Sequence, residues 1–494
     1  MTSSRNLAHG RTDSLDQGAS ATPTLREEPV DVPLKEKSPK HPDPEAQPDD
    51  EIEHAEETEQ VEGRTAGEKD VLIVDWEGPD DPQNPKNWTF KQKWAATAIV
   101  SAFTFISPVS SSMIAPASDA LAAQFGITSS VLIALTTSIF VLAYAFGPLF
   151  LGPLNRRWSS GDCWRTEERG KAVALYSLAP LLGPVVGPVA GAWIAERSTW
   201  RWVFWSTSIV DAFIQVLGVF FLQETFAPLL LERKAARMRK EMESDPEKAP
   251  AREIRTRFDH SDRHWQQIFA KALVRPFKLF WFEPIAQLLG AYMAFVYGLL
   301  YLFLTTIPGI FEGVYGERVG IAGLHYFALG VGLTGASQIN ARFMDRIYMY
   351  YTKKNGGKGR PEYRLPSMVP GTIFLPMGLF ITGWTAQART HWIAPDIGIA
   401  LVGAGTILNF QSIQTYVIDT FTLHAASALA AVTFLRSCAG FGFPLFAPTM
   451  YQALGYGKGD TILGCIAIVI GCPAPWIFWY YGERIRKASK YARS

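Results

Sequence analysis

The stretch LGPVVGPVAG occupies residues 182–191, inside an apolar run that extends from Lys171 to Ile194. Its distinctive residues are three glycines spaced four positions apart, with a proline after each of the first two: Gly183, Pro184, Gly187, Pro188 and Gly191. Small residues at this spacing line one face of a helix and let a second backbone approach closely. Each proline removes a backbone donor and bends its helix. The pattern fits tight packing alone, or a bent contact between two halves of a bundle that rock against each other.

Apolar runs of this length recur along most of the chain. A membrane span needs roughly 20 predominantly apolar residues to cross ~30 Å of hydrocarbon. About ten runs meet that measure: Trp94–Ala115, Ser129–Leu151, Lys171–Ile194, Trp202–Gln223, Glu283–Ile307, Val319–Ile339, Pro366–Ala386, Trp392–Tyr416, Ala425–Met450 and Thr461–Tyr481. They are continuously apolar and do not alternate, so they predict helices rather than barrel strands. The sequence therefore predicts an all-α, polytopic membrane bundle embedded in a lipid bilayer.

Polar segments divide this bundle. Residues 1–72 are rich in Pro, Glu, Asp, Ser and Thr and poor in aromatics, which predicts a disordered N-terminal tail. Residues 225–280 carry mixed charge and separate a first lobe, 73–224, with four spans, from a second lobe, 281–482, with six. We interpret 225–280 as a helical or disordered linker, and 483–494 as a short tail. Two bundles joined by a long loop are typical of carriers.

Basic residues predict the orientation of the spans. Arg and Lys are concentrated in 225–280, in 340–365 and at the C-terminal end. The loops on the opposite side carry fewer basic residues: Arg197, Arg201, Arg318, Arg389 and Lys458. Because basic loops remain in the cytosol, both termini are expected there, in a multi-pass protein.

Several classes of function are disfavoured. The net charge of +1 gives no field that would attract nucleic acid. The chain has four cysteines: Cys163, Cys438, Cys465 and Cys472. Their spacing forms no metal-type or redox pair, so no metal site is expected. No glycine-rich phosphate loop with its lysine is present, which argues against an ATP-driven pump. Clustered histidines and a nucleophile arrangement are also absent, so the chain is not expected to be an enzyme or to hold a cofactor.

The glycine–proline stretch resembles the antiporter signature, motif C, of drug:proton antiporters in the major facilitator superfamily. Further segments resemble the fungal branch that contains multidrug and polyamine exporters. They are DWEGPDDPQNPKNW at 75–88, EERGKAVALYS at 167–177, EP at 283–284, YRLP at 363–366, QSIQTYVID at 411–419, FPLF at 443–446 and YGERIRK at 481–487. The resemblance covers about residues 73–491.

This resemblance implies a two-lobed transporter that works by alternating access. It further implies a monomer in the plasma membrane that exports small amphipathic or cationic organic compounds, such as drugs, toxins, secondary metabolites or polyamines. The proton gradient would supply the energy, with protons as the coupled ion. In this family the glycine–proline face would lie at a contact between the lobes.

One segment departs from the family pattern. The gating motif A begins at Gly152 and breaks off at Asn155, and the pattern resumes at Asp162, which in relatives follows the fourth span. Spans three and four of the usual twelve are therefore missing, a loss of about 50 residues that a missed exon or a mis-spliced gene would explain. Removing two spans preserves the orientation of the rest but takes a cavity-lining helix from the first lobe. A transport-inactive or truncated membrane protein is thus one alternative to an exporter, and an uptake carrier is another.

Two ionisable residues inside predicted spans are candidates for function, because charges in the membrane are costly. Asp211 lies near the middle of its span and is a candidate for proton coupling, if burial raises its pKa, or for a structural hydrogen bond. Arg436 could bind an anionic group, pair with a carboxylate, or extend toward the cytosolic surface.

The spans that line the cavity in relatives supply further candidates for substrate contact: Tyr292, Tyr297, Tyr301, Asn409, Gln411 and Gln414. Aromatic faces can hold an organic cation, and the amides can fix its orientation. Tyrosines at helical spacing also fit ordinary packing or an interfacial belt. Both interpretations remain open for these residues.

Overall fold

The structure is a computed structural model, and it describes residues 71–78, 81–154, 163–164, 169–225, 227–244, 253–256, 265–489 and 492. The part from Lys69 to Ser494 forms one compact unit. The tail expected over 1–72 lies almost entirely outside the described residues. The segment from Asn155 to Asp162, where the family pattern breaks off, also lies outside them.

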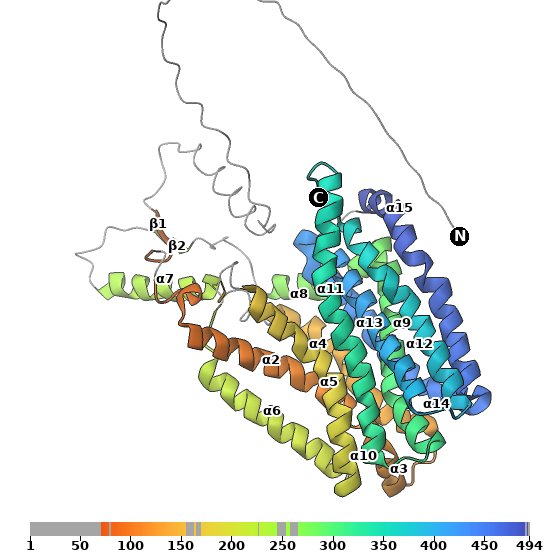
Figure 1. The fold of residues 1–494 in the computed structure, drawn as a ribbon. Helices are drawn as coiled ribbons and strands as arrows, with labels where there is room; N and C mark the ends of the chain where they lie inside the picture. Colours follow the sequence, from red (N-terminus) through yellow and green to blue (C-terminus); the bar gives the residue numbers. More distant parts are fainter. Residues whose placement is uncertain are drawn as a thin grey trace, which may run out of the picture. The chain divides into compact units, whose positions relative to one another are not determined.

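Four long helices make up the first lobe (Figure 1): α2 (Phe90–Ser112), α4 (Ser130–Leu154), α5 (Arg169–Arg197) and α6 (Arg201–Phe221). The short helix α3 (Ser118–Phe125) precedes α4. Helix α2 begins with a capping box, in which Thr89 accepts from the backbone N–H of Gln92 while the Gln92 side chain accepts from that of Thr89. Such a box satisfies N–H groups that the first turn leaves unpaired.

The second lobe contains α9 (Pro284–Pro308), α10 (Val319–Ala322), α11 (Tyr326–Lys354), α12 (Val369–Gln387), α13 (Ile393–Thr420), α14 (Ala425–Gly471) and α15 (Pro473–Ala488). Shorter turns connect them: η3 (Gly309–Val314), η4 (Gly323–His325), η5 (Pro361–Met368) and η6 (Thr422–His424). Two more turns, η1 (Pro85–Asn87) and η2 (Ala115–Ala117), flank α2.

The described residues contain nine helical stretches long and apolar enough to cross a membrane, and the last of them holds two spans. This stretch, Ala425–Ala488, has 64 residues, or about 96 Å at 1.5 Å per residue, roughly three times the hydrocarbon thickness. Gly455 interrupts it with φ 76°, in the left-handed region that favours glycine. The Tyr451 hydroxyl then donates to the Asp460 carboxylate at 2.6 Å, across this break. The ten predicted spans are thereby accounted for.

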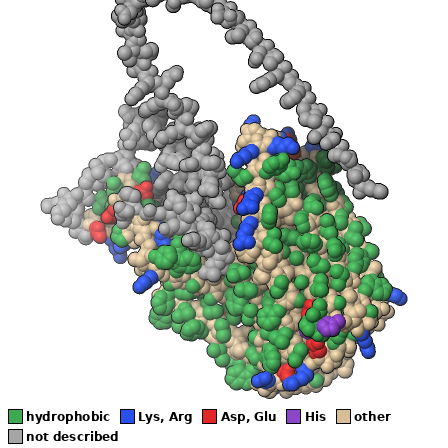
Figure 2. Space-filling view, in the orientation of Figure 1, with side chains coloured by type: hydrophobic (Ala, Val, Ile, Leu, Met, Phe, Trp, Pro, Cys, Tyr) green, Lys and Arg blue, Asp and Glu red, His purple; other side chains and the backbone are tan. Residues whose placement is uncertain are grey.

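The outer surface of these helices is apolar. Figure 2 shows hydrophobic side chains covering much of the visible face, while Lys, Arg, Asp and Glu gather toward its ends. Helix α6 is the clearest example, since Phe213 is 62% and Val219 81% exposed. An apolar cover this continuous fits a surface that lipid, not water, surrounds.

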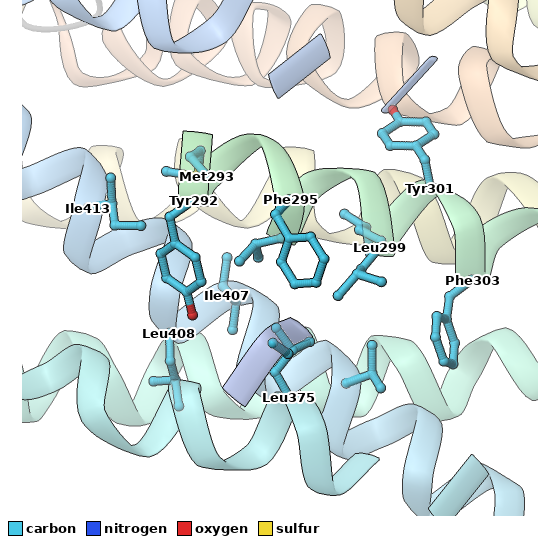
Figure 3. Close-up of a cluster of buried hydrophobic side chains, with 14 of the residues drawn as sticks. Tyr292, Met293, Phe295, Leu299, Tyr301, Phe303, Leu375, Ile407, Leu408 and Ile413 are labelled. Carbon is cyan, nitrogen blue, oxygen red and sulfur yellow. The ribbon is translucent and has the colours of Figure 1, made fainter. Parts of the chain in front are cut away.

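The main hydrophobic core belongs to the second lobe and is centred on α9. Figure 3 shows side chains of α9, among them Phe295 and Leu299, meeting Leu375 of α12 and Ile407 of α13. A separate, smaller cluster joins α2 to α6 and includes Ile106 and Ile214. The two lobes therefore differ in how much apolar surface each encloses.

The segment between the lobes is partly helical, which agrees with one of the two interpretations of the sequence, and it also contains a short strand. It contains α7 (Ala227–Ser244), β2 (Glu253–Thr256) and α8 (Trp265–Phe282). Strand β2 pairs in parallel with β1 (Val71–Val74), in the register Val71 to Glu253. This two-stranded sheet is a correction to two expectations, because β1 begins inside the predicted tail and the linker was expected to be helical or disordered. Strands of four residues are too short to reveal a period, and their partners lie far apart in the chain.

The segment at 75–88, which resembles the fungal branch, folds around one carboxylate. Asp81 accepts from the backbone N–H groups of Glu77, at 3.0 Å, and Gln83, at 2.8 Å. Lys234 of α7 lies 3.7 Å from the same carboxylate. Burial acts to raise the pKa of Asp81, but these donors and the lysine charge outweigh it and hold the pKa below its usual value. This loop thereby ties the start of α2 to α7.

Candidate functional site

The glycine–proline stretch lies in α5, and its glycines pack against α2 of the same lobe. A Cβ added at Gly183 would lie 2.4 Å from the Pro108 ring, and one at Gly191 would lie 2.0 Å from the Met113 carbonyl oxygen. Gly187 is equally close to α2. Only a hydrogen at these positions permits such an approach. The structure therefore places the three glycines in tight packing within the first lobe, and not at the contact between lobes that the resemblance implied. The carbonyl of Pro188 does lie at that contact, 3.7 Å from a Cβ added at Gly323 of the second lobe.

A different face of α5 meets the second lobe. A Cβ at Gly330 of α11 would lie 2.8 Å from Val185, and one at Gly323 of η4 would lie 2.4 Å from Ala192. At the end of this contact Glu196 pairs with Arg318 and accepts from the backbone N–H of Gly320 at 2.6 Å. Helices α5 and α11 thus form one junction between the lobes.

The second junction joins α4 to α14. Helix α4 packs more extensively against α14 than against α2 of its own lobe. Phe146 of α4 meets Phe434 of α14 with ring centroids 5.7 Å apart, and a Cβ at Gly440 would lie 3.0 Å from Val141. The first lobe is therefore divided, with α4 attached to the second lobe.

Three tyrosines gather where α2, α4 and α9 meet. The Tyr301 hydroxyl of α9 lies 3.2 Å from the Ser111 hydroxyl of α2, which links the two lobes. The Tyr144 hydroxyl of α4 lies 2.9 Å from the Ser107 hydroxyl of α2. Tyr297 lies beside Tyr301, with ring centroids 5.0 Å apart. Figure 3 shows Tyr301 pointing away from the apolar cluster, on the opposite side of α9 from Tyr292.

Arg436 of α14 adjoins this group of tyrosines. Its guanidinium carbon lies 4.8 Å from the ring centre of Tyr297 and 4.8 Å from that of Phe410 in α13. Its Nε is buried and has no hydrogen-bond partner among the described residues. Tyr297, Tyr301 and Arg436, three of the predicted cavity residues, are therefore brought together between α9 and α14.

The other predicted cavity residues contribute to packing inside the second lobe. The Tyr292 hydroxyl donates to the Asn409 side chain at 3.1 Å, and Asn409 is fully buried. The Gln411 amide donates to Ser337 at 2.7 Å and accepts from Asn340 at 2.9 Å, which ties α13 to α11. Gln414 is half-buried on α13. Of the two interpretations left open, helix packing describes Tyr292, Asn409 and Gln411.

Asp211, the candidate for proton coupling, lies on α6 and not between the lobes. The side-chain amide of Gln215 donates to its carboxylate at 2.8 Å. Asp211 also lines a cavity of about 150 Å³ whose other walls come from α2 and α4. Ser110 and Thr207 contribute hydroxyl groups to this cavity. The site offers a carboxylate in a small recess of the first lobe whose walls are partly polar and partly apolar.

Sequence reasoning missed a histidine held between two carboxylates. In η4, the Nδ1 of His325 lies 2.9 Å from the Asp396 carboxylate, and its Nε2 lies 2.9 Å from that of Glu317. Phe311 stacks on the imidazole, with ring centroids 3.4 Å apart. Since each nitrogen faces a carboxylate acceptor, this arrangement favours the ring form that carries a proton on both nitrogens. Asp396 is 71 positions away in the chain, so no local motif marks this group.

The resemblance to the fungal branch also included residues 363–366, and the structure explains part of that motif. Arg364 donates to Asp419 of α13 at 3.0 Å and to Asp345 of α11 at 2.8 Å. The ring of Tyr348 lies 4.3 Å from its guanidinium carbon. Arg364 is thus a fully partnered arginine that joins three elements of the second lobe.

Comparison with known proteins assigns the chain to a family. Residues 159–444 match the sequence family described as the Major Facilitator Superfamily. The chain belongs to this superfamily. Efflux pump vrtL of Penicillium aethiopicum is 42% identical over 474 residues, covering 86% of this chain and 92% of the relative. MFS-type transporter penM of Penicillium rubens is 40% identical over 479 residues, covering 87% and 92%. The resemblance to the fungal efflux branch of the superfamily is confirmed.

Solved transporters of the superfamily share the fold. The xylose transporter XylE from E. coli, in a partially occluded inward-open conformation, aligns with a TM-score of 0.51 at 14% identity, covering 79% of this chain and 99% of XylE. A POT family transporter, solved with a thioalcohol-conjugated peptide, also gives 0.51, at 10% identity, covering 82% and 99%. The all-α membrane bundle predicted from the sequence is thereby confirmed.

The alignments also give the number of residues that the relatives have and this chain does not. The alignment with Efflux pump vrtL spans 474 positions, whereas 86% of 494 residues is about 425. About 49 positions of that alignment therefore have no residue in this chain. The alignment with MFS-type transporter penM gives the same shortfall, since 87% of 494 is about 430 of 479 positions. This number matches the roughly 50 residues that two spans and their turn require.

Proposed function

We propose that the protein is a secondary active exporter that moves small organic compounds out of the cell across the plasma membrane. The observation that carries this proposal is the 42% identity to Efflux pump vrtL over 474 residues. In this proposal the two lobes rock about the junctions of α5 with α11 and of α4 with α14. The tyrosine hydroxyls and Arg436 then form the substrate site, because they lie where elements of both lobes meet.

The proposal includes coupling to protons, with Asp211 as the exchanging group. A carboxyl group in a small, partly polar recess of a membrane helix can bind and release a proton as its surroundings change. Asp211→Asn keeps the shape and the hydrogen bond to Gln215 but cannot ionise. We expect this variant to insert normally and to lose proton-driven flux. Gln215→Ala is the control, and it should retain coupling because the carboxylate remains.

Accumulation of test compounds in drug-sensitive cells examines the exporter proposal. Cells that express the chain should hold less compound than vector controls, and a protonophore should remove the difference. Export that persists with the protonophore would contradict proton coupling but would leave the exporter function standing. A stably inserted chain that lowers the accumulation of no compound in a broad panel would contradict the exporter function itself.

Two observations favour a second candidate, a transport-inactive membrane protein. About 49 aligned positions are absent from the chain, and only 17% of the most apolar window of α6 is buried. To separate the two candidates, the segment of Efflux pump vrtL that has no equivalent in this chain is inserted after Leu154. If the exposed face of α6 is the surface these spans normally cover, labelling of Ser208→Cys should fall several-fold and export should rise. Measurable export by the chain without the insert, at the same level as with the insert, would contradict the inactive candidate.

A further inference from the structure

We propose that the substrate carries an acidic group, a carboxylate or an ionised phenol, and that the guanidinium of Arg436 binds it. This inference rests on the proposed export function and names the chemistry of its cargo. It reverses the expectation of a cationic substrate that the family resemblance suggested. The argument depends on what surrounds Arg436 and on a comparison with a second arginine of the same lobe.

Arg436 has aromatic neighbours but no acidic partner among the described residues. The rings of Tyr297 and Phe410 each lie 4.8 Å from its guanidinium carbon. Arg436 is half-buried, and cation–π contacts of this kind compensate only part of the hydration that its guanidinium loses on partial burial. Its Nε is buried and has no hydrogen-bond partner among the residues that the structure describes. The positive charge is therefore incompletely balanced.

Arg364 shows how the same lobe treats an arginine with a structural role. Its guanidinium has an aromatic neighbour too, the ring of Tyr348 at 4.3 Å. In addition it donates to two carboxylates, Asp419 at 3.0 Å and Asp345 at 2.8 Å. Arg436 has the aromatic contacts without either carboxylate. A bound anion would supply to Arg436 the negative charge and the hydrogen-bond acceptors that Arg364 receives from Asp419 and Asp345.

The shape of guanidinium suits such an anion. Its N–H groups lie in one plane and bind carboxylates in a two-pronged arrangement. The rings of Tyr297 and Phe410 come from two different helices and limit the orientations that the group can take. An acidic group conjugated to a flat organic body would pair with the guanidinium while its body packs on aromatic side chains.

The neighbourhood of Arg436 also connects both lobes. Tyr297 lies beside Tyr301, whose hydroxyl contacts Ser111 of the first lobe at 3.2 Å. A ligand bound at Arg436 therefore lies next to a contact that must change when the lobes move. Cations, in contrast, would meet an uncompensated positive charge at this point.

Binding of two xanthene dyes to the purified full chain tests the proposal. Fluorescein is an anion at neutral pH, and rhodamine 123 is a cation of similar shape. Fluorescence anisotropy should show saturable binding of fluorescein and weaker binding of rhodamine 123. Arg436→Gln should weaken fluorescein binding about tenfold or more, a loss typical of one charged contact, while Arg436→Lys should retain part of it. Arg342→Gln, which removes an exposed arginine of α11, is the matched control and should bind normally.

A competition experiment on the unmodified protein covers the case in which Arg436→Gln fails to fold. 1-Naphthoate should displace fluorescein, whereas the neutral 1-naphthylmethanol should not. Equal displacement by the alcohol, no saturable binding of fluorescein, stronger binding of rhodamine 123, or unchanged binding in a folded Arg436→Gln would each overturn the inference.

The outcomes for this inference and for the exporter proposal are distinguishable. Saturable, Arg436-dependent binding of fluorescein without export from cells would contradict the proposed function and support the acidic-ligand site. Export of rhodamine 123 with no binding of fluorescein would support an exporter and overturn the acidic-ligand site.

Discussion

The two lobes enclose their helices to very different degrees. In Pro284–Val314 of the second lobe, 78% of the most apolar window is buried, whereas in α6 of the first lobe the share is 17%. Helix α9 packs mainly against α14 and α13, while α6 contacts mainly α2. Helix α9 therefore depends for its stability on neighbouring helices, whereas most of the apolar surface of α6 faces its surroundings.

Truncating one phenylalanine in each lobe should reveal this difference most strongly. Phe303 of α9 is 1% exposed and Phe213 of α6 is 62% exposed. Phe303→Ala leaves a cavity and should lower the free energy of unfolding by about 3–5 kcal/mol. Phe213→Ala should change it by no more than ~0.5 kcal/mol, because that side chain faces the surroundings. Thermal unfolding of both variants in the same detergent measures the contrast, and equal losses would mean that α6 is covered.

Within the first lobe, the packing of α5 on α2 should be intolerant of any added atom. Gly191→Ala would bring a Cβ within 2.0 Å of the Met113 carbonyl oxygen, so one helix must move. We expect a loss of about 1–3 kcal/mol in the free energy of unfolding. Gly442→Ala in α14 is the matched control, since nothing lies within 4 Å of its added Cβ. A stable Gly191→Ala variant would show that the two helices are not in close contact.

His325 should give the second lobe a stability that depends on pH. The folded state favours a doubly protonated imidazole between Glu317 and Asp396, so its stabilisation is full in acid and is lost as the pH rises and the ring deprotonates. His325→Gln should cost about 1–3 kcal/mol at low pH and less at high pH. His391→Gln, at an exposed position, should show no such trend. Melting temperatures measured across pH 5 to 9 on all three proteins test this expectation.

The smallest expected effect is at the contact between lobes. Arg318 is largely exposed where it pairs with Glu196, and exposed ion pairs contribute only about 0.2–1 kcal/mol. Glu196→Gln should leave the unfolding temperature nearly unchanged while making the adjoining ends of α5 and α11 easier to separate. Accessibility of a cysteine introduced at Ala322, which is 1% exposed, would report this, with Lys458→Gln at an exposed position as the control that leaves the ion pair intact. Unaltered accessibility would mean that Glu196 does not hold the lobes together.

Much of the fold could be predicted from the sequence, because apolar length alone defines a membrane span. The close approach at Gly183 and Gly191 was also predictable, since four-residue spacing places both on one helix face. Which helix they face was not, because it depends on how α5 is rotated in the bundle. The pairing of Val71 with Glu253 and the contact of His325 with Asp396 escaped prediction for a related reason. Each joins residues that only the complete fold brings together.

The candidate site shows the same division. The residue types at Tyr297, Tyr301 and Arg436 suggested a binding site, and the structure places them side by side. The equally suggestive Tyr292 and Asn409 proved to be partners of each other. Sequence cannot separate these cases, since both sets of residues have helical spacing and similar chemistry. The direction in which each side chain leaves its helix decides between them.

The attachment of α4 to α14 means that the covalent boundary between the lobes and their physical boundary do not coincide. A chain severed between α7 and α8 would still be held together, because α4 on one fragment carries a surface that fits α14 on the other. Two separately synthesised fragments would therefore have a built-in means of recognising each other in the bilayer. Helix α4 would then hold the N-terminal fragment on the C-terminal one through its contact with α14.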